Sequence, residues 1–545
     1  MEEIPSESLM RSLCTAQELV SKLLNAGSRE SLDILHSLED ILVPTLSTVR
    51  CSINSFCPIN HCPDDILGLI FQYSVALIDD TADEFQWPFS SFRPSSKLID
   101  LTHICRRWRI LALNLPLLWT HIGDRSSDPL LRAVSTFLQR SRMAPLKFHI
   151  RGKRHINIRS DSFKLNLSRM EELHVDYISD LFGLYNSAPA LKVLTLDSVL
   201  RSVEQMLFHS NTPLLKALTM HSMTWFPKNP LPSLTHLCFY SIKPMYTLRL
   251  SGLADFLRAC PGLVELIVAN ASLILPAVDH PPVTLKHLQR LSIGEMCNDV
   301  LSWFLEHIET HSALSTRIFG LKYDPDKPLP DIALLNGSTL LHVGASSSIL
   351  LVTAADSSSG VRIECEIPRA PILYKGPGVF PWASWPLVTI TELHITDSRE
   401  VSECAGLYAL FCALSSLSIL VYNGGGIFRL RGVLSSLSRT LSPPTPHPPC
   451  PSLSTLCVHM NSESYAVCDA LAEFVATRAG LGYPLHNVIV EYDDPDMLNK
   501  GVLPGLDLIK HVQSVQYRQS SGATSTVRWP AAACNGGTHK FWPSW

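Results

Sequence analysis

Thiol and imidazole side chains gather near the start of the chain, at Cys51, Cys57, His61 and Cys62. These are the ligand types that zinc prefers. Their spacing contains no paired Cys-x-x-Cys, and no second pair of ligands follows. Cys57 precedes Pro58 and Cys62 opens an apolar helical pattern, so we expect these side chains to pack and not to bind a metal.

Carboxylates gather at Asp493, Asp494 and Asp496, but the stretch lacks the further ligands and terminal glutamate of a calcium loop. We interpret it as a solvated turn. The chain carries no phosphate-binding loop, dinucleotide fingerprint, nucleophile elbow or His-Glu-x-x-His helix. No nucleophile, base and orienting group can be placed together, so we expect no cofactor and no enzymatic activity. An enzyme with a dispersed site is the least favoured hypothesis.

The composition indicates a folded protein with more than one part. The chain has 545 residues, of which 46% are hydrophobic and 17% are charged. Its net charge of −4 favours neither nucleic acid nor a membrane as a partner. A basic cluster between Arg140 and Lys164 has no interleaved aromatic residues, so we interpret it as a solvated face.

Cysteine usage and hydropathy bear on the compartment. The 15 cysteines are odd in number and scattered, which is typical of reduced thiols in the cytosol or nucleus. The first ten residues have three glutamates and no apolar run, so we expect no signal peptide. Residues 405–421 approach the length of a membrane span. Serines interrupt them, however, which favours a helix ending at Ala413 and a strand over residues 417–421.

Residues 1–52 are expected to be helical. Leucines recur there at spacings of three and four, and Gly27 breaks the pattern. A helical hairpin is the simplest interpretation. A coiled-coil dimer is less favoured because the stretch contains few heptads.

Two short apolar helices follow, within residues 62–71 and 101–119. Pro63 and Asp64 suit a helix start, because proline has no N–H to lose and a carboxylate stabilises the positive end of the helix dipole. One apolar face then consists of Ile66, Leu67, Ile70 and Phe71. The second helix has Leu101, Ile104, Cys105, Trp108 and Leu111 on its apolar side, with Arg106, Arg107 and Arg109 in solvent.

Residues 74–97 separate the two helices and are rich in turn signals, so we expect a loop insertion there. Helices this short cannot bury all their apolar surface internally. The helix of a partner protein is a natural place for the remainder.

From about residue 145 the pattern Leu-x-x-Leu-x-Leu recurs, with apolar replacements, at residues 191–196, 215–220, 234–239, 263–268, 288–293, 390–395, 414–419 and 453–458. The irregular period of about 20–30 residues is that of leucine-rich repeats. Helix-like segments lie between the repeats, which predicts a curved solenoid with a parallel sheet. Residues 320–385 interrupt the series, and Ile349–Thr353 with Val361–Ile367 read as a hairpin or as degenerate repeats.

In such a solenoid the last two apolar side chains of each repeat point inward, and the residue between them points to the concave face. These intervening residues are the candidate substrate-binding positions Thr195, Thr219, Cys238, Ile267, Ser292, His394 and Cys457. Their mostly uncharged character suits a protein or peptide partner. The fold class is therefore α/β, and residues 521–545 are expected to form a loose tail.

Together, the Pro58-Ile59-Asn60, Pro63-to-Leu67, Ile104-to-Arg109 and Leu118-Trp119 pieces resemble an F-box, and the whole chain resembles the F-box proteins with leucine-rich repeats of mushroom-forming fungi. The domains are then a helical segment (1–52), the F-box (53–124, with its insertion at 74–97), an irregular solenoid (125–520) and the tail (521–545). Cys62, where many relatives have leucine, and the long insertion depart from the family pattern.

The resemblance implies that the F-box binds a Skp-type adaptor, which bridges to a cullin, and that the repeats recruit a protein substrate for ubiquitin transfer. Carried over by position, the adaptor contacts are Pro63, Ile66, Leu67, Ile70, Leu101, Cys105 and Trp108. The protein would be cytoplasmic, nuclear or both. An interaction scaffold without a ligase role is the alternative.

Overall fold

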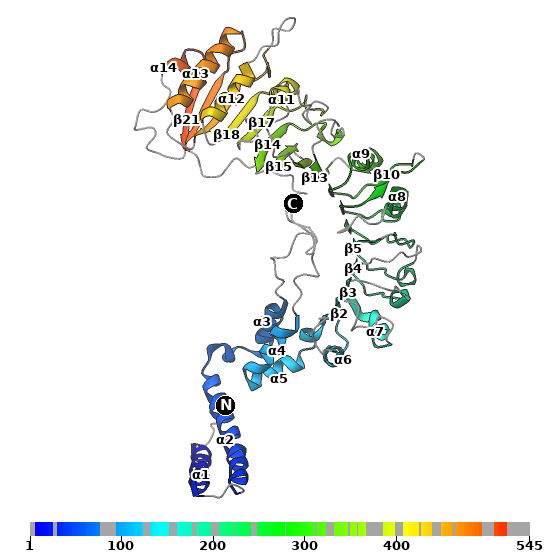
Figure 1. Ribbon diagram of the computed structural model, residues 1–545, viewed down its shortest axis with the longest axis vertical. Helices are drawn as coiled ribbons and strands as arrows, with labels where there is room; N and C mark the ends of the chain where they lie inside the picture. Colours follow the sequence, from blue (N-terminus) through cyan, green and yellow to red (C-terminus); the bar gives the residue numbers. More distant parts are fainter. Residues whose placement is uncertain are drawn as a thin grey trace. The chain divides into compact units, whose positions relative to one another are not determined.

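The structure is a computed structural model and describes residues 6–25, 30–76, 94–123, 131–151, 161–176, 182–197, 206–223, 225–240, 248–277, 280–310, 313–322, 332–346, 349–356, 358–366, 385–397, 407–424, 427–438, 448–460, 465–492 and 506–519. The chain forms two compact units (Figure 1). The helical unit contains the described residues up to Arg151 together with Arg169–Glu171. The sheet unit contains the other described residues.

The helical unit is built from α1 (Ser6–Asn25), α2 (Glu30–Ser55), η1 (Pro58–His61), α3 (Asp64–Ala76), α4 (Pro94–Ile104), α5 (Arg106–Asn114), η2 (Pro116–Trp119), β1 (His121–Gly123), α6 (Leu131–Arg140) and β2 (Leu146–Arg151). The two helices α1 and α2 form the expected N-terminal hairpin. Strands β1 and β2 pair in parallel. Helix α3 ends at Ala76 and α4 begins at Pro94, so the interval between them is shorter than the insertion expected at residues 74–97. The residues of this interval, 77–93, lie outside the described residues.

The second apolar segment folds as two helices and not one. Cys105 adopts an extended conformation between α4 and α5, and its Sγ accepts a hydrogen bond from the backbone N–H of Trp108 at 3.5 Å. This thiol therefore takes the place of an N-cap side chain. Because the chain is not helical at Cys105, the apolar face predicted for one continuous helix is not kept: Ile104 is exposed, whereas Trp108 is buried.

The sheet unit contains β3 (Met170–Asp176), β4 (Val193–Asp197), β5 (Ala217–His221), β6 (His236–Tyr240), β8 (Glu265–Ala269), β11 (Arg290–Gly294), β13 (Ser315–Lys322), β14 (Leu340–Ser346), β15 (Ile349–Ala355), β16 (Gly360–Glu366), β17 (Glu392–Asp397), β18 (Ile419–Gly424), β19 (Thr455–Met460), β20 (Asn487–Tyr492) and β21 (Ser514–Gln519). Neighbouring strands from β3 to β13 and from β17 to β21 pair in parallel. The result is a large, mostly parallel sheet of an α/β protein.

One row of aligned leucines runs through the first repeats: Leu194, Leu218, Leu237, Leu266 and Leu291. These side chains and Leu196 are buried, which confirms the prediction that they lie in consecutive parallel strands. Successive strands begin between 19 residues (Ala217 to His236) and 29 residues (His236 to Glu265) apart. Each leucine is buried by its neighbours in the row, so no single repeat forms a core alone.

The turns after the strands repeat as well. Ser222, Asn270 and Glu295 each follow a strand directly with φ of 48°, 49° and 52°. Each donates its backbone N–H to a carbonyl of the next strand, at 2.9 Å, 3.0 Å and 3.1 Å. The repeat is thus one of backbone conformation as well as of leucine spacing.

The interruption after β13 is an inserted meander. Strand β15 pairs antiparallel with β14 and β16, which confirms a hairpin at this place, while Ile367 lies outside the described residues. The spatial order is β13, β16, β15, β14 and β17, with β16 and β14 parallel to their outer neighbours. The insertion therefore continues the sheet without breaking it.

The predicted repeat at 414–419 is displaced by three residues. Leu420 and Tyr422 of β18 align with Leu393 and Ile395 of β17, so the repeat consists of Leu417, Leu420 and Tyr422. The prediction was wrong because Leu414, Leu417 and Ile419 also fit the Leu-x-x-Leu-x-Leu pattern, three residues earlier in the chain. Residues 405–421 accordingly divide into α11 (Leu407–Ala413) and a strand.

Helices cover the sheet beside these strands, among them α8 (Leu250–Arg258), α9 (Asn298–His307), α12 (Ile427–Ser438) and α13 (Tyr465–Gly480) (Figure 1). Shorter elements are α7 (Asp161–Asn166), η3 (Leu167–Arg169), η4 (Phe182–Tyr185), η5 (Phe208–Ser210), β7 (Leu248–Arg249), β9 (Leu273–Ile274), β10 (Val283–Leu285), β12 (Ile308–Thr310), η6 (Ala333–Leu335) and α14 (Leu506–Ile509). Every helix in the described part of the chain is too short or too polar to traverse a lipid bilayer.

A buried cation fixes α13. Arg478 donates from its two terminal nitrogens to the carbonyls of Pro449 and Cys450, at 3.1 Å and 3.0 Å, and burial lowers its pKa. These bonds tie the helix to the turn that precedes β19. The tail at 521–545, Asp493–Asp496 and the basic residues Lys153, Arg154 and Arg159 lie outside the described residues.

The leucine row gives a test of the sheet unit. Leu218→Ala should lower the free energy of unfolding by about 2–5 kcal/mol, because it leaves a cavity in a buried row. Leu214→Ala is the matched control, since Leu214 belongs to the same repeat but is exposed. Urea unfolding followed by circular dichroism measures both. Equal losses from the two substitutions would contradict the buried row.

Candidate docking surface

The core between α3, α4 and α5 is aromatic. Leu67, Phe71 and Leu98 are fully buried, and the rings of Phe71 and Trp108 lie 4.8 Å apart between centroids. Gly68 lies in the interior of α3, where an added Cβ would come within 3.1 Å of Leu115 Cδ1. The absence of a side chain there lets Leu115 pack directly against the helix.

Polar bonds hold α5 against the segment before α3. The indole Nε1 of Trp108 donates to Asn60 Oδ1 at 2.7 Å, and the side-chain amide of Asn60 donates to the carbonyl of Asn54 at 2.7 Å. The buried indole N–H is thus satisfied, which a buried tryptophan requires. Trp108 therefore orients α5 from inside the unit.

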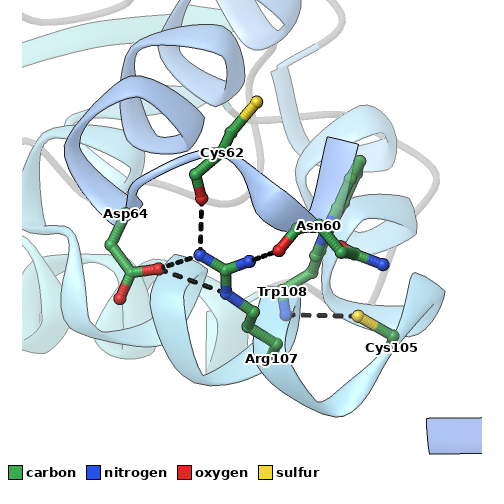
Figure 2. Close-up of polar contacts among 6 residues, drawn as sticks. All are labelled: Asn60, Cys62, Asp64, Cys105, Arg107 and Trp108. Carbon is green, nitrogen blue, oxygen red and sulfur yellow. Dashed lines mark hydrogen bonds and ion pairs between the residues drawn. The ribbon is translucent and has the colours of Figure 1, made fainter. Parts of the chain in front are cut away.

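Arg107 makes the other connection (Figure 2). Its guanidinium donates to Asp64 Oδ1 at 2.6 Å and 3.2 Å, to the carbonyl of Cys62 at 2.7 Å and to the carbonyl of Asn60. Arg107 lies only partly in solvent, where the sequence predicted a solvent-facing side chain: it is 38% exposed and bonded to the chain. It satisfies carbonyls at the end of η1 and pairs with the first residue of α3, so it fixes how α3 begins.

The opposite side of α3 is apolar and uncovered. Ile66, Leu69, Ile70 and Tyr73 lie at helical spacing, and their exposed fractions range from 39% for Ile70 to 76% for Tyr73. We call these four residues the α3 stripe. A helix that buries one apolar face and exposes another has an unpartnered surface.

Other exposed apolar side chains lie on the neighbouring elements of the same unit, at Ile99 and Ile104 of α4, Ile110 of α5 and Leu117 of η2. They are large and aliphatic, as protein-docking surfaces often are. The α3 stripe is therefore not a lone patch in this unit.

The structure separates the sequence-predicted adaptor contacts into three groups. Pro63, Ile66 and Ile70 are exposed, and Leu101 and Cys105 are half-buried. Leu67 and Trp108 are buried, so the prediction that they meet a partner is corrected: they pack between α3 and α5. Leu69 and Tyr73 were missed, although their spacing of three and seven residues from Ile66 marks the same helical face.

The candidate substrate positions form one row across the sheet. Strand register aligns Thr195, Thr219, Cys238, Ile267 and Ser292 on successive strands. Beyond the meander, His394 and Cys457 continue the same row on either side of Val421. The register prediction thus extends over the whole sheet.

Their exposure differs from the prediction. Ser292 is half-buried, whereas the other six side chains are buried. Thr195 shares a hydrogen bond of 2.8 Å with His174 on the next strand, and His394 bonds Glu392 at 2.6 Å. Side chains on neighbouring strands cover one another on this face, so only Ser292 of the seven offers appreciable surface.

Ionisable groups on the same face were not anticipated. Glu265 lies 3.7 Å from His236 and 3.8 Å from Arg290, on the two flanking strands. Farther along, Glu364 contacts Arg317 at 3.2 Å and Arg362 at 2.8 Å. Arg362 and Glu364 share β16, but the other partners come from different strands, so no local sequence motif marks these contacts. Glu265 thus has Arg290 as a partner within the sheet, and Glu364 lies between two arginines.

Burial lowers the pKa of two histidines on this face. Burial lowers the pKa of His221 to about 4, and its ring lies 5.6 Å from that of Tyr240. Burial and the neighbouring His394 lower the pKa of His342. Among the described residues, no group of three or more His, Cys, Asp or Glu side chains is placed to hold a metal ion.

No protein-family model matches the chain, and no curated protein or solved structure matches it either.

The buried His221 predicts a pH dependence of stability. Its folded pKa lies below the ordinary value of 6.5, so the unfolded chain binds a proton that the folded chain does not as the pH falls from about 6.5 to about 4. Stability that is present above pH 6.5 is lost in this window, by about 2–3 kcal/mol at pH 4.5.

His221→Gln should lessen this loss between pH 7.5 and pH 4.5, measured by urea unfolding at both values. His103→Gln, at an exposed position, controls for the loss of one imidazole. An unchanged pH slope in His221→Gln would show that this histidine does not carry the effect.

Proposed function

We propose that the protein is a substrate receptor of a Skp-cullin-F-box ubiquitin ligase. The observation that carries the proposal is the α3 stripe, an uncovered apolar face on a helix whose other face is held by Phe71, Trp108 and Arg107. A partner helix placed on this face would bury apolar surface that the unit itself leaves in water.

The adaptor contacts that we propose are the exposed members of the helical unit. They comprise Pro63, Ile66, Leu69, Ile70 and Tyr73, with Leu101 and Cys105 at the margin. Leu67 and Trp108 act indirectly, because they set the orientation of α3 and α5 from within. This revised set keeps the adaptor site in the same segment of the chain.

We further propose that the sheet unit is a leucine-rich-repeat solenoid that recruits a protein substrate. Its support is the aligned leucine row, the recurring left-handed turns and, from β3 to β13, sheet strands that begin 19 to 29 residues apart. A stacked array offers an extended surface on which a protein can bind. Because six of the seven candidate positions are buried, we propose that the substrate contacts other residues of that surface.

Adaptor binding is tested with the full chain. Ile66→Asp combined with Ile70→Asp should weaken binding to the Skp adaptor at least 100-fold, because central apolar contacts contribute about 2 kcal/mol or more each. Folding should persist, since both side chains are exposed. Isothermal titration calorimetry measures affinity, and circular dichroism measures folding.

Met143→Asp is the control, because Met143 is an exposed apolar residue outside the α3 stripe. It should bind the adaptor as the unmodified chain does. Leu67→Asp should instead unfold the helical unit. If the folded, unmodified chain binds no Skp adaptor from its own organism, the proposal fails.

The scaffold alternative is separated by ubiquitin transfer. In a reconstituted cullin assembly, a receptor supports transfer to a captured partner, and the Ile66→Asp/Ile70→Asp variant does not. A stable partner complex without transfer, and with an unchanged partner lifetime in cells, would favour the scaffold.

A further inference from the structure

The N-terminal hairpin buries only one apolar stripe per helix. Ala16 of α1 and Leu38 of α2 are buried where the helices meet, and Leu19 and Ile41 are half-buried beside them. The two helices lie side by side and are joined across residues 26–29, so they run antiparallel (Figure 1). This contact accounts for the hairpin but not for the rest of its apolar side chains.

A second stripe on α1 is exposed. Met10, Leu13, Val20 and Leu24 are all exposed, and their spacing is that of alternating steps of three and four residues, with Gln17 at the intervening position. This is the spacing of the a and d positions of a helical bundle. The stripe is therefore patterned for packing against other helices.

Helix α2 carries the same pattern. Leu32, Leu35, Leu42 and Leu46 are exposed at steps of three, seven and four, and Glu39 occupies the intervening position. Each helix thus has one polar residue in the middle of an exposed apolar stripe. The hairpin is patterned as half of a four-helix bundle.

Both stripes lie on one side of the hairpin. In each helix the exposed stripe follows the buried one by a single residue, a rotation of about 100°. Because the helices are antiparallel, these rotations have opposite sense in space and bring both stripes to the same face. Leu13 and Leu42 each lie twelve residues from the adjacent helix ends at Asn25 and Glu30, Val20 and Leu35 each lie five away, and Gln17 and Glu39 lie eight and nine away.

We propose that this face binds the same face of a second copy of the chain, forming a dimer through a four-helix bundle. A face two helices wide and about 30 Å long covers about 600 Å² on each copy, and a specific interface needs about 1,000 Å² in total. The area therefore suffices without a contribution from other parts of the chain.

The polar layer selects a second copy as the occupant. Gln17 and Glu39 lie between apolar layers on both sides, so a partner must present polar groups at that level and leucines elsewhere. A second copy related by a two-fold axis meets this requirement at every layer. Buried polar layers of this kind specify helical pairing at a cost in stability. The proposal does not rest on the proposed function.

Sedimentation equilibrium of the full chain tests the proposal. The unmodified protein should have twice the chain mass of 60.5 kDa, and Leu13→Glu combined with Leu42→Glu should reduce it to a single chain. Thr15→Glu combined with Ser37→Glu is the charge-matched control, because both residues are exposed and lie off the stripe. The control should remain dimeric, and circular dichroism should show equal helix content in all three proteins.

A gain-of-affinity variant keeps the test decisive if the glutamate variant unfolds. Gln17→Leu combined with Glu39→Leu removes the polar layer and should lower the dimer dissociation constant at least tenfold. A monomeric unmodified chain at 100 µM would overturn the proposal. A dimer whose affinity is unchanged by both stripe variants would overturn it as well.

Discussion

The packing of Phe71 against Trp108 determines what the helical unit can present to a partner. This contact turns one side of α3 inward, and the bonds of Trp108 to Asn60 and of Arg107 to Asp64 prevent the two helices from exchanging faces. Ile66, Leu69, Ile70 and Tyr73 are left outside as a consequence. An exposed apolar surface on α3 thus results from the choice of interior.

The sheet unit obeys a related constraint, because its repeats bury their leucines only against neighbouring repeats. The sheet continues across the meander, because β16 pairs in parallel with β13 and β14 pairs in parallel with β17 on either side of β15. On the face that holds Cys238 and Ile267, packed side chains and the contact of Glu265 with Arg290 fill the space between strands. A dimer through the hairpin would give each assembly two helical units and two sheet units, so substrate capture could be bivalent.

Periodicity predicted the elements whose burial depends on local spacing. The leucine row, the hairpin of β15 and β16, and the division of residues 405–421 into helix and strand all follow from such spacing. It failed where two registers fit equally, as at Leu414 and Leu417. Periodicity also failed to predict which apolar side of α3 is buried, because this depends on tertiary packing. Leu67 and Ile70 are equally apolar, but α5 packs against Leu67 and leaves Ile70 exposed. The bonds of Arg107 and the contact of Glu265 with Arg290 join residues from separate elements, and no spacing within one element indicates them.

Site-specific photo-crosslinking tests the central claim that α3 has one held face and one docking face. A photoreactive amino acid at Leu69 in the full chain, mixed with the Skp adaptor, should form a covalent product with the adaptor. The same group at Met143, which is exposed and outside the stripe, should form little. Crosslinking from Leu69 that exceeds that from Met143 agrees with the account. Equal crosslinking from both positions, or none from Leu69 in a folded chain, would contradict it.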